Sequence, residues 1–226
     1  MRALWKDGRV MDPSVVIWKS IPAEDYERHM AHPDVGQTQA LAAIFKEIYD
    51  ATEPRSIAIL GCTTGNGLAC IRPGITRGVV GVDVNQQFLD VARQRFGAQG
   101  YALELFCGDL LTTDFGRGFD LIHAALIFEY LDPAALVNCV ASRLGDIGLC
   151  SVVLQQHADD HGTPSVTPTG ITSLEPLADH IEIREMRDIE FRFRERGIIL
   201  QERWDVPLPN NKSFDVAVFG WKNSRS

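Results

Sequence analysis

Three glycines, Gly61, Gly65 and Gly67, lie in a short stretch that could bind a nucleotide-like ligand. They follow the apolar run 57–60, which is typical of a buried parallel strand. Glycine adopts main-chain angles that are closed to other residues and lets a ligand approach the backbone. A strand, a glycine-rich turn and the start of a helix at Leu68 form the layout that places a nucleotide at the end of a strand. The same pattern also fits a purely structural strand–helix turn.

The spacing of these glycines differs from that of two common nucleotide-binding loops. The chain reads G-x-x-x-G-x-G, whereas the dinucleotide fingerprint G-x-G-x-x-G would need glycine where Thr63 and Asn66 stand. A P-loop needs Gly-Lys-Ser or Gly-Lys-Thr, and no such sequence follows Gly65. The pattern therefore disfavours both an NAD site and a nucleoside triphosphate site.

An acidic residue, Asp83, ends the next apolar run, 79–82. It lies 83 − 61 = 22 residues after Gly61, close to the roughly 20 residues at which a carboxylate holds ribose hydroxyls. A carboxylate can accept two hydrogen bonds from a ribose diol. The alternative is that Asp83 or Asn85 caps the helix that follows.

Four blocks of sequence, at 60–67, 81–83, 107–110 and 119–122, together resemble the class I S-adenosylmethionine-dependent methyltransferases. The resemblance spans roughly residues 33–226 and implies that Asp109 accepts from the adenine amino group. Thr63 departs from the pattern, because the family commonly has glycine at this point of the turn. The resemblance implies that the cofactor-binding residues are Gly61, Cys62, Thr63, Gly65, Asp83, Val84, Gly108, Asp109, Leu110 and Ala124.

Hydrophobic periodicity predicts an α/β chain in which strands and helices alternate. We expect strands at 57–60, 79–83, 103–107, 119–125, 149–154, 198–206 and 213–221, and helices at 39–50, 86–96, 133–144, 174–180 and 188–196. The apolar run 15–18 fits a strand or a segment at the domain edge. The last two strands have a short connection and must therefore be antiparallel. The predicted fold is a Rossmann-like three-layer sandwich with a mostly parallel seven-stranded sheet and a C-terminal antiparallel hairpin.

Residues 1–32 form a predicted N-terminal segment in front of the domain at 33–226. Tyr26, His29 and Met30 share one face of a helix. The resemblance implies that such a helix covers the cofactor and shapes the acceptor pocket, which makes Tyr26 and His29 candidate substrate contacts. The alternative is an ordinary amphipathic helix.

The residues that follow the strand 119–125 should lie over the reactive end of the cofactor, because ligands bind outside the carboxyl ends of strands in open α/β sheets. Glu129 and Tyr130 are candidates for orienting an acceptor there, and Glu129 could take a proton. His123 could also be a base, although strand alternation fits a buried structural histidine equally well. The polar segment 155–170 suits a flap over the acceptor.

The composition favours a small-molecule acceptor. A formal net charge of −8 disfavours a nucleic-acid substrate. The 5 cysteines have no C-x-x-C spacing, so we expect reduced thiols and no metal site. The chain shows neither a signal-peptide pattern nor a run of transmembrane length, so a cytoplasmic location and no membrane partner are expected.

From these features we expect an S-adenosylmethionine-dependent methyltransferase that moves a methyl group to a small molecule by in-line displacement. The sulfonium carries the activation, so the protein mainly supplies alignment and a dry pocket. One alternative is a non-catalytic cofactor-binding or interaction module on the same fold. Another is an NAD-dependent oxidoreductase, which the glycine spacing, Asp109 and the terminal hairpin disfavour.

Overall fold

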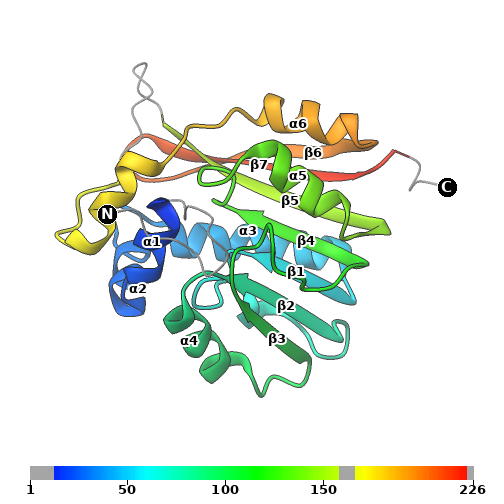
Figure 1. Ribbon diagram of the computed structural model, residues 1–226, viewed down its shortest axis with the longest axis horizontal. Coiled ribbons are helices and arrows are strands. Elements are labelled where there is room, and N and C mark those ends of the chain that lie inside the picture. The colour runs from blue at the N-terminus through cyan, green and yellow to red at the C-terminus, as the bar shows by residue number, and fades with distance from the viewer. Residues whose placement is uncertain (1–12, 158–165, 223–226) are drawn as a thin grey trace.

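The computed structural model describes residues 13–157 and 166–222, and this part of the chain contains one seven-stranded sheet (Figure 1). The strand order is β3-β2-β1-β4-β5-β7-β6, and β7 runs antiparallel to both β5 and β6. This arrangement confirms the predicted Rossmann-like fold and its antiparallel hairpin. The strands are β1 Ser56–Leu60, β2 Gly78–Asp83, β3 Ala102–Cys107, β4 Phe119–Ala125, β5 Leu144–His157, β6 Ile198–Pro207 and β7 Lys212–Trp221.

Helices cover both faces of the sheet and enclose two separate apolar cores (Figure 1). One core receives side chains from α3 and α4, such as Phe45 and Phe88, and the other receives Leu136 of α5 and Phe193 of α6. The helical elements are α1 Pro13–Ser20, α2 Ala23–Met30, α3 Gln37–Thr52, η1 Leu68–Cys70, α4 Gln86–Phe96, α5 Pro133–Ala141, η2 Thr172–His180 and α6 Met186–Glu195.

The helix expected after the glycine turn is absent, and this prediction was wrong. Only the 3₁₀ turn η1 forms there. Pro73 lacks a main-chain N–H and disfavours the helical conformation of the residue before it, and Gly74 follows at once. The chain therefore returns to β2 through a loop, residues 71–77.

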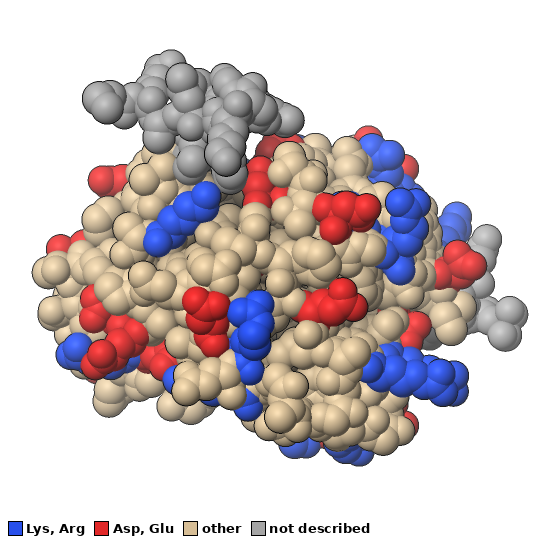
Figure 2. All heavy atoms as spheres, turned by 60° about the horizontal axis from the view of Figure 1, so that its bottom comes forward, with Lys and Arg blue, Asp and Glu red and all other residues tan. Residues whose placement is uncertain are grey.

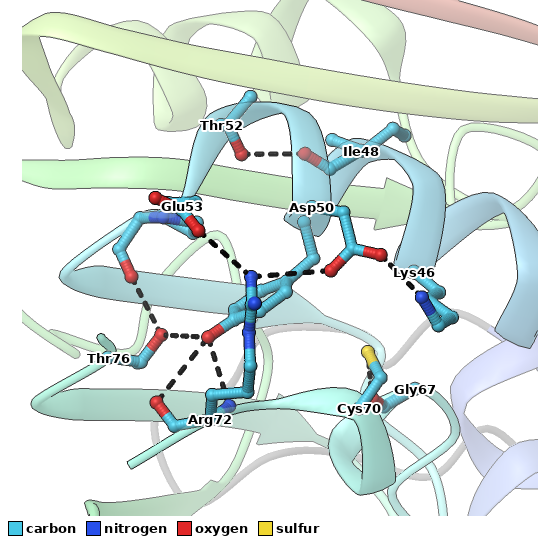
Figure 3. Close-up of polar contacts among 11 residues, drawn as sticks. Lys46, Ile48, Asp50, Thr52, Glu53, Gly67, Cys70, Arg72 and Thr76 are labelled. Carbon is cyan, nitrogen blue, oxygen red and sulfur yellow. Dashed lines mark hydrogen bonds and ion pairs between the residues drawn. The ribbon is translucent and has the colours of Figure 1, made fainter. Parts of the chain in front are cut away.

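This loop is attached to the carboxyl end of α3 by a group of polar contacts (Figure 3). The hydroxyl of Tyr49 accepts from the main-chain N–H of Arg72 at 3.0 Å and hydrogen bonds with the hydroxyl of Thr76 at 3.1 Å. The guanidinium of Arg72 pairs with Asp50 at 3.3 Å and with Glu53 at 3.1 Å (Figure 3). These contacts hold the loop in place where a helix would otherwise do so.

Three further elements differ from expectation. The run 15–18 lies in α1, because four apolar residues alone do not separate a strand from a short helix. The segment at 174–180 lies within the 3₁₀ helix η2, which contains Pro176. The helix from Pro133 ends at Ala141, and Gly148 lies in β5, where an added Cβ would be 2.4 Å from the carbonyl oxygen of Phe119.

No helix in the described ranges, 13–157 and 166–222, is both long and apolar enough to cross a membrane.

Candidate functional site

A cavity of about 190 Å³ lies at the carboxyl ends of β1, β2 and β4 and beneath α1, α2 and η2. Residues from the turns after β1, β2, β3 and β4 all reach it. The cavity therefore joins the predicted cofactor positions to the predicted acceptor positions. The predicted site residues that line it are Tyr26, His29, Gly61, Cys62, Thr63, Asp83, Val84, Gly108, Asp109, Leu110, His123, Glu129 and Tyr130.

The turn after β1 folds back onto β2 through main-chain hydrogen bonds. The N–H groups of Gly61 and Cys62 donate to the carbonyl of Val82 at 2.9 and 3.1 Å. Gly61 has a φ of 70° and Thr63 a φ of 45°. A positive φ is unusual for a β-branched residue, so the main chain is strained at Thr63, beside the cavity.

Asp83 is buried, and both of its carboxylate oxygens accept from the main chain. Oδ2 accepts from the N–H of Thr63 and Oδ1 from the N–H of Asn85, each at 2.9 Å. Burial raises the pKa of Asp83 to about 6, although the backbone hydrogen bonds oppose this rise. Each carboxylate oxygen can accept a further bond, so the geometry leaves Asp83 able to hold a diol.

Asn85, and not Asp83, caps α4. Its Oδ1 accepts from the N–H of Gln87 at 2.9 Å and from that of Phe88 at 3.4 Å. Its Nδ2 donates to the carbonyls of Trp18 and Ile21, both at 2.8 Å. One side chain thus starts a helix of the domain, the capping role that the sequence analysis allowed for Asn85, and also holds the N-terminal helices, which the sequence analysis did not predict.

Asp109 lies in a tight turn after β3. Its Oδ1 accepts from the N–H of Leu111 at 2.9 Å, and its carbonyl accepts from the N–H of Thr113 at 2.8 Å. Gly108 leaves room for this turn, because a Cβ there would be 2.5 Å from Oγ1 of Thr113. The carboxylate of Asp109 is therefore fixed at the rim of the cavity.

Aromatic side chains of the N-terminal helices form part of the cavity wall. The ring of Tyr26 packs against Phe88, with centroids 5.0 Å apart, and Trp18 meets Tyr130 edge-on at 5.3 Å. Burial raises the pKa of Tyr26 to about 12, and a hydrogen bond with the Thr63 side chain opposes that rise. Trp18 was not predicted as a site residue, because an apolar run alone does not show which element it will face.

His29 faces the segment before η2. Its Nδ1 hydrogen bonds with Oγ1 of Thr169 at 2.9 Å. Burial lowers the pKa of His29, and the charges of His32 and Lys212 lower it further. His29 thus joins the N-terminal segment to residues far along the chain.

His123 lies in the wall of the cavity in a setting that suits a structural histidine. Its Nδ1 hydrogen bonds with Oγ of Ser151 at 2.7 Å, and its ring meets Phe45 edge-on at 5.0 Å. Burial lowers the pKa of His123 to about 4, so the imidazole is neutral near pH 7.

Glu129 is only 4% exposed and follows β4. Its Oε1 accepts from the N–H of Gln155 at 2.9 Å, and its carbonyl accepts from the N–H of Glu182 at 2.9 Å. Burial raises the pKa of Glu129 to about 7, against the opposing effects of the Gln155 hydrogen bond and the charge of Arg184. Burial also raises the pKa of Tyr130 well above its usual value.

Two predicted cofactor residues do not line the cavity. Gly65, with a φ of 93°, allows the ring of Phe96 to pack closely, because an added Cβ would be 2.7 Å from it. Ala124 packs in the core on the opposite face of the sheet, while its neighbour Ala125 lines the cavity. Alternation along β4 thus places Ala125 where Ala124 was expected.

The segment 155–170 contributes partly to the cavity. Gln155, Val166 and Thr167 line it, while residues 158–165 lie outside the described part of the chain. Among the residues that are described, no group of three or more His, Cys, Asp or Glu side chains is arranged to hold a metal ion.

The chain is similar to known methyltransferases in sequence over part of its length and in structure over most of it. Residues 57–144 match the family model of a methyltransferase domain. The magnesium protoporphyrin IX methyltransferase of Synechocystis PCC 6803, solved with bound SAH, superposes with a TM-score of 0.68 at 15% identity, covering 93% of this chain and 100% of that one.

Two further solved structures share the fold. An S-adenosylmethionine-dependent methyltransferase from Clostridium acetobutylicum ATCC 824 gives a TM-score of 0.61 at 16% identity over 88% of this chain and 97% of that one. The [4+2]-cyclase SpnF gives 0.63 at 12% identity over 81% of both chains. None of the curated proteins is significantly similar in sequence.

Proposed function

We propose that this chain, which matches a methyltransferase domain over residues 57–144 and has the fold of S-adenosylmethionine-dependent methyltransferases, methylates a small molecule held beneath α1, α2 and η2. The observation that carries the proposal is that one and the same cavity is lined by the strand-end turns and by these helices. Because helices α1, α2 and η2 cover this cavity, a compact acceptor fits it better than a macromolecule does.

The surface supports a small acceptor as well. The net charge is −8. On the face shown in Figure 2, Lys and Arg side chains are interspersed with Asp and Glu and do not form a single basic patch. Nucleic-acid binding depends on concentrated positive charge.

The hydrogen-bonding groups that line the cavity fit S-adenosylmethionine. We assign the ribose hydroxyls to Asp83, whose oxygens are held by Thr63 and Asn85 and retain accepting capacity. We assign the adenine amino group to Asp109 and the close main-chain approach to the turn at Gly61. When bound, S-adenosylmethionine supplies a methyl group activated by the sulfonium, for in-line displacement.

The residues of the chain contribute alignment and exclusion of water. The aromatic rings of Trp18, Tyr26 and Tyr130 close the cavity above the strand ends. Glu129 and Tyr130 are the polar groups that we assign to the acceptor. A dry, rigid pocket strengthens polar interactions with the acceptor and holds the reacting atoms in line.

Calorimetric titration with S-adenosylmethionine, S-adenosylhomocysteine and NAD tests the cofactor assignment. We expect the two sulfur nucleosides to bind and NAD not to bind. Asp83→Ala should weaken binding of both nucleosides at least about tenfold, since a hydrogen bond to a charged group contributes about 1.5–3 kcal/mol. Asp90→Ala, on the exposed side of α4, is the matched control and should bind as wild type does. Tighter binding of NAD than of either nucleoside would refute the assignment.

A further inference from the structure

One side-chain oxygen of Glu129, a residue that lines the cavity, has no hydrogen-bond partner among the described residues. Oε2 of Glu129 is buried and makes no hydrogen bond, whereas Oε1 accepts from the N–H of Gln155 at 2.9 Å. Arg184, which lowers the pKa of Glu129 through its charge, directs its Nε to the carbonyl of Phe128 instead. Buried polar atoms are normally satisfied, so an unsatisfied oxygen in a cavity wall indicates a hydrogen-bond donor on a ligand.

The lining of the cavity is mostly apolar, although polar residues such as Gln37, Gln155 and Lys212 also line it. Leu126, Ile127 and Leu131 flank Glu129 in sequence, and Leu174, Leu177 and Ile181 come from η2 and the residue that follows. Tyr130 and Trp18 add aromatic surface. A ligand that satisfies Oε2 in this setting has an apolar body and places a single donor at the carboxylate.

We propose that the methyl acceptor is an apolar compound with a weakly acidic hydroxyl of the phenol type, and that this hydroxyl donates to Oε2 of Glu129, which takes its proton. The inference rests on the proposed function and names the acceptor class for the same cavity. The O–H bond breaks and its proton passes to Oε2. The oxygen forms the new bond to the methyl carbon, the carbon–sulfur bond breaks, and the sulfonium becomes a neutral thioether.

The pKa values of the Glu129 carboxyl and of the reacting group on the acceptor favour a phenol over an aliphatic alcohol or an amine. Burial raises the pKa of Glu129 to about 7, which suits a base that works near neutral pH. A phenol has a pKa of about 10, so proton transfer to Glu129 is within reach, whereas an aliphatic alcohol is far less acidic. An amine would enter as a cation, and pairing with the carboxylate would hold it in the protonated, non-nucleophilic form.

The charged and titratable groups that face Glu129 are Arg184, Tyr130 and, through Tyr130, Tyr26. Arg184 favours the carboxylate form of Glu129. Burial keeps both tyrosines neutral near pH 7. Asp83, whose pKa is about 6, lines the same cavity, so the Glu129→Gln variant is needed to assign a change between pH 6 and 8 to Glu129.

Binding of two probes to the protein saturated with S-adenosylhomocysteine tests the proposal without requiring turnover. The probes are 2-naphthol and its methyl ether, 2-methoxynaphthalene. At pH 8 we expect 2-naphthol to bind at least about tenfold more tightly than the ether, because only the hydroxyl donates to the carboxylate. The preference should shrink at pH 6, where protonated Glu129 can donate to either oxygen.

Glu129→Gln separates donor recognition from packing. Its amide oxygen can still accept from Gln155, so its NH₂ group occupies the position of Oε2 and the preference for 2-naphthol over the ether should disappear. Glu175→Gln, on the exposed side of η2, should keep that preference. Both variants should bind S-adenosylhomocysteine within about twofold of wild type, which also establishes that they are folded.

Two results would overturn the proposal: equal binding of 2-naphthol and the ether by wild type, or no binding of either probe. An unchanged preference in Glu129→Gln would overturn the role of Oε2. Failure of the wild-type protein to bind S-adenosylhomocysteine would instead refute the proposed function, so the two failures are distinguishable.

Discussion

Asn85 and Trp18 are 67 residues apart in sequence, yet the side-chain amide of Asn85 donates to the carbonyl of Trp18 at 2.8 Å. The same amide donates to Ile21 and caps α4 with its oxygen. Asn85, which begins α4 after strand β2, thus also holds the N-terminal helices. Closure of the cavity depends on this link.

Asn85→Asp is expected to detach the N-terminal helices while α4 stays intact. Aspartate still caps the helix, but an oxygen replaces the amide nitrogen and faces two carbonyls. We expect a loss of about 3 kcal/mol in unfolding free energy, since two buried hydrogen bonds are lost and a charge is left unpaired. Hydrogen exchange should accelerate in residues 13–30 and remain slow in residues 86–96.

The matched control is the reverse substitution, Asp132→Asn, at the N-cap of α5. Asp132 caps that helix by accepting from the N–H of Ala135 at 2.8 Å. Asp132→Asn preserves this bond and should leave exchange at 13–30 unchanged. Equal acceleration in both segments of Asn85→Asp would contradict the dual role of Asn85.

The raised pKa of Asp83, about 6 against an ordinary value of 3.8, makes stability depend on pH. The folded state binds this proton more tightly than the unfolded state does, so the contribution is fully present below pH 4 and is lost as the pH rises through 6. The loss should be about 3 kcal/mol, given about 1.4 kcal/mol per pKa unit. Urea unfolding of wild type and Asp83→Asn between pH 4 and 8 measures it.

Asp83→Asn should lack this slope, whereas the contribution of Glu129 at higher pH is common to both proteins. Parallel pH profiles for the two proteins would show that Asp83 is not responsible. Affinity for S-adenosylmethionine should increase over the same pH range, because the ionised carboxylate is the better acceptor for hydroxyl donors.

At Thr63, the glycine variant should be more stable than the alanine variant, which reverses the usual order of stability for these two substitutions. Thr63→Ala and Thr63→Gly both remove the hydroxyl that contacts Tyr26, but only glycine relaxes the φ of 45°. The glycine variant should therefore be more stable than the alanine variant by about 1 kcal/mol. Urea unfolding provides the comparison, and a more stable alanine variant would show that no strain is stored at Thr63.

The hydroxyl of Tyr49 should be important for the loop that replaces the missing helix. Tyr49→Phe leaves the N–H of Arg72 and the hydroxyl of Thr76 without this partner, at a cost of about 1–3 kcal/mol. Tyr101→Phe removes only one 3.5 Å contact, to the carbonyl of Leu68, and should cost less than about 1 kcal/mol. Thermal unfolding of both variants tests this difference, and equal losses would contradict it.

The parts of the fold that sequence could predict are those specified by neighbouring residues. The run 79–82 followed by Asp83 has both the periodicity of a strand and the spacing of a ligand-binding acid, and β2 ends at Asp83 as predicted. Helix α4 likewise follows from its apolar spacing and from Asn85 as a possible cap.

The parts that could not be predicted depend on contacts between distant residues or on a shift of one residue. The apolar run 15–18 lies in a helix because of what it packs against, and the link from Asn85 to Trp18 leaves no local trace. Ala124 and Ala125 are equally small, so only the direction of their side chains on β4 decides which one faces the cavity. The unpartnered oxygen of Glu129 is visible only once its neighbours are in place.

Helix α2 and the segment at the start of η2 are far apart in sequence but meet beside the cavity, since Asp25 accepts from Ser173 and His29 contacts Thr169. During synthesis, helix α2 therefore leaves the ribosome long before Thr169 and Ser173 exist. At about 5–20 residues per second, that interval is about 7–30 seconds. Before it ends, Tyr26 of α2 can already pack against Phe88, but the contacts of α2 with Thr169 and Ser173 are missing, so the cavity of a nascent chain closes only after these residues have been made.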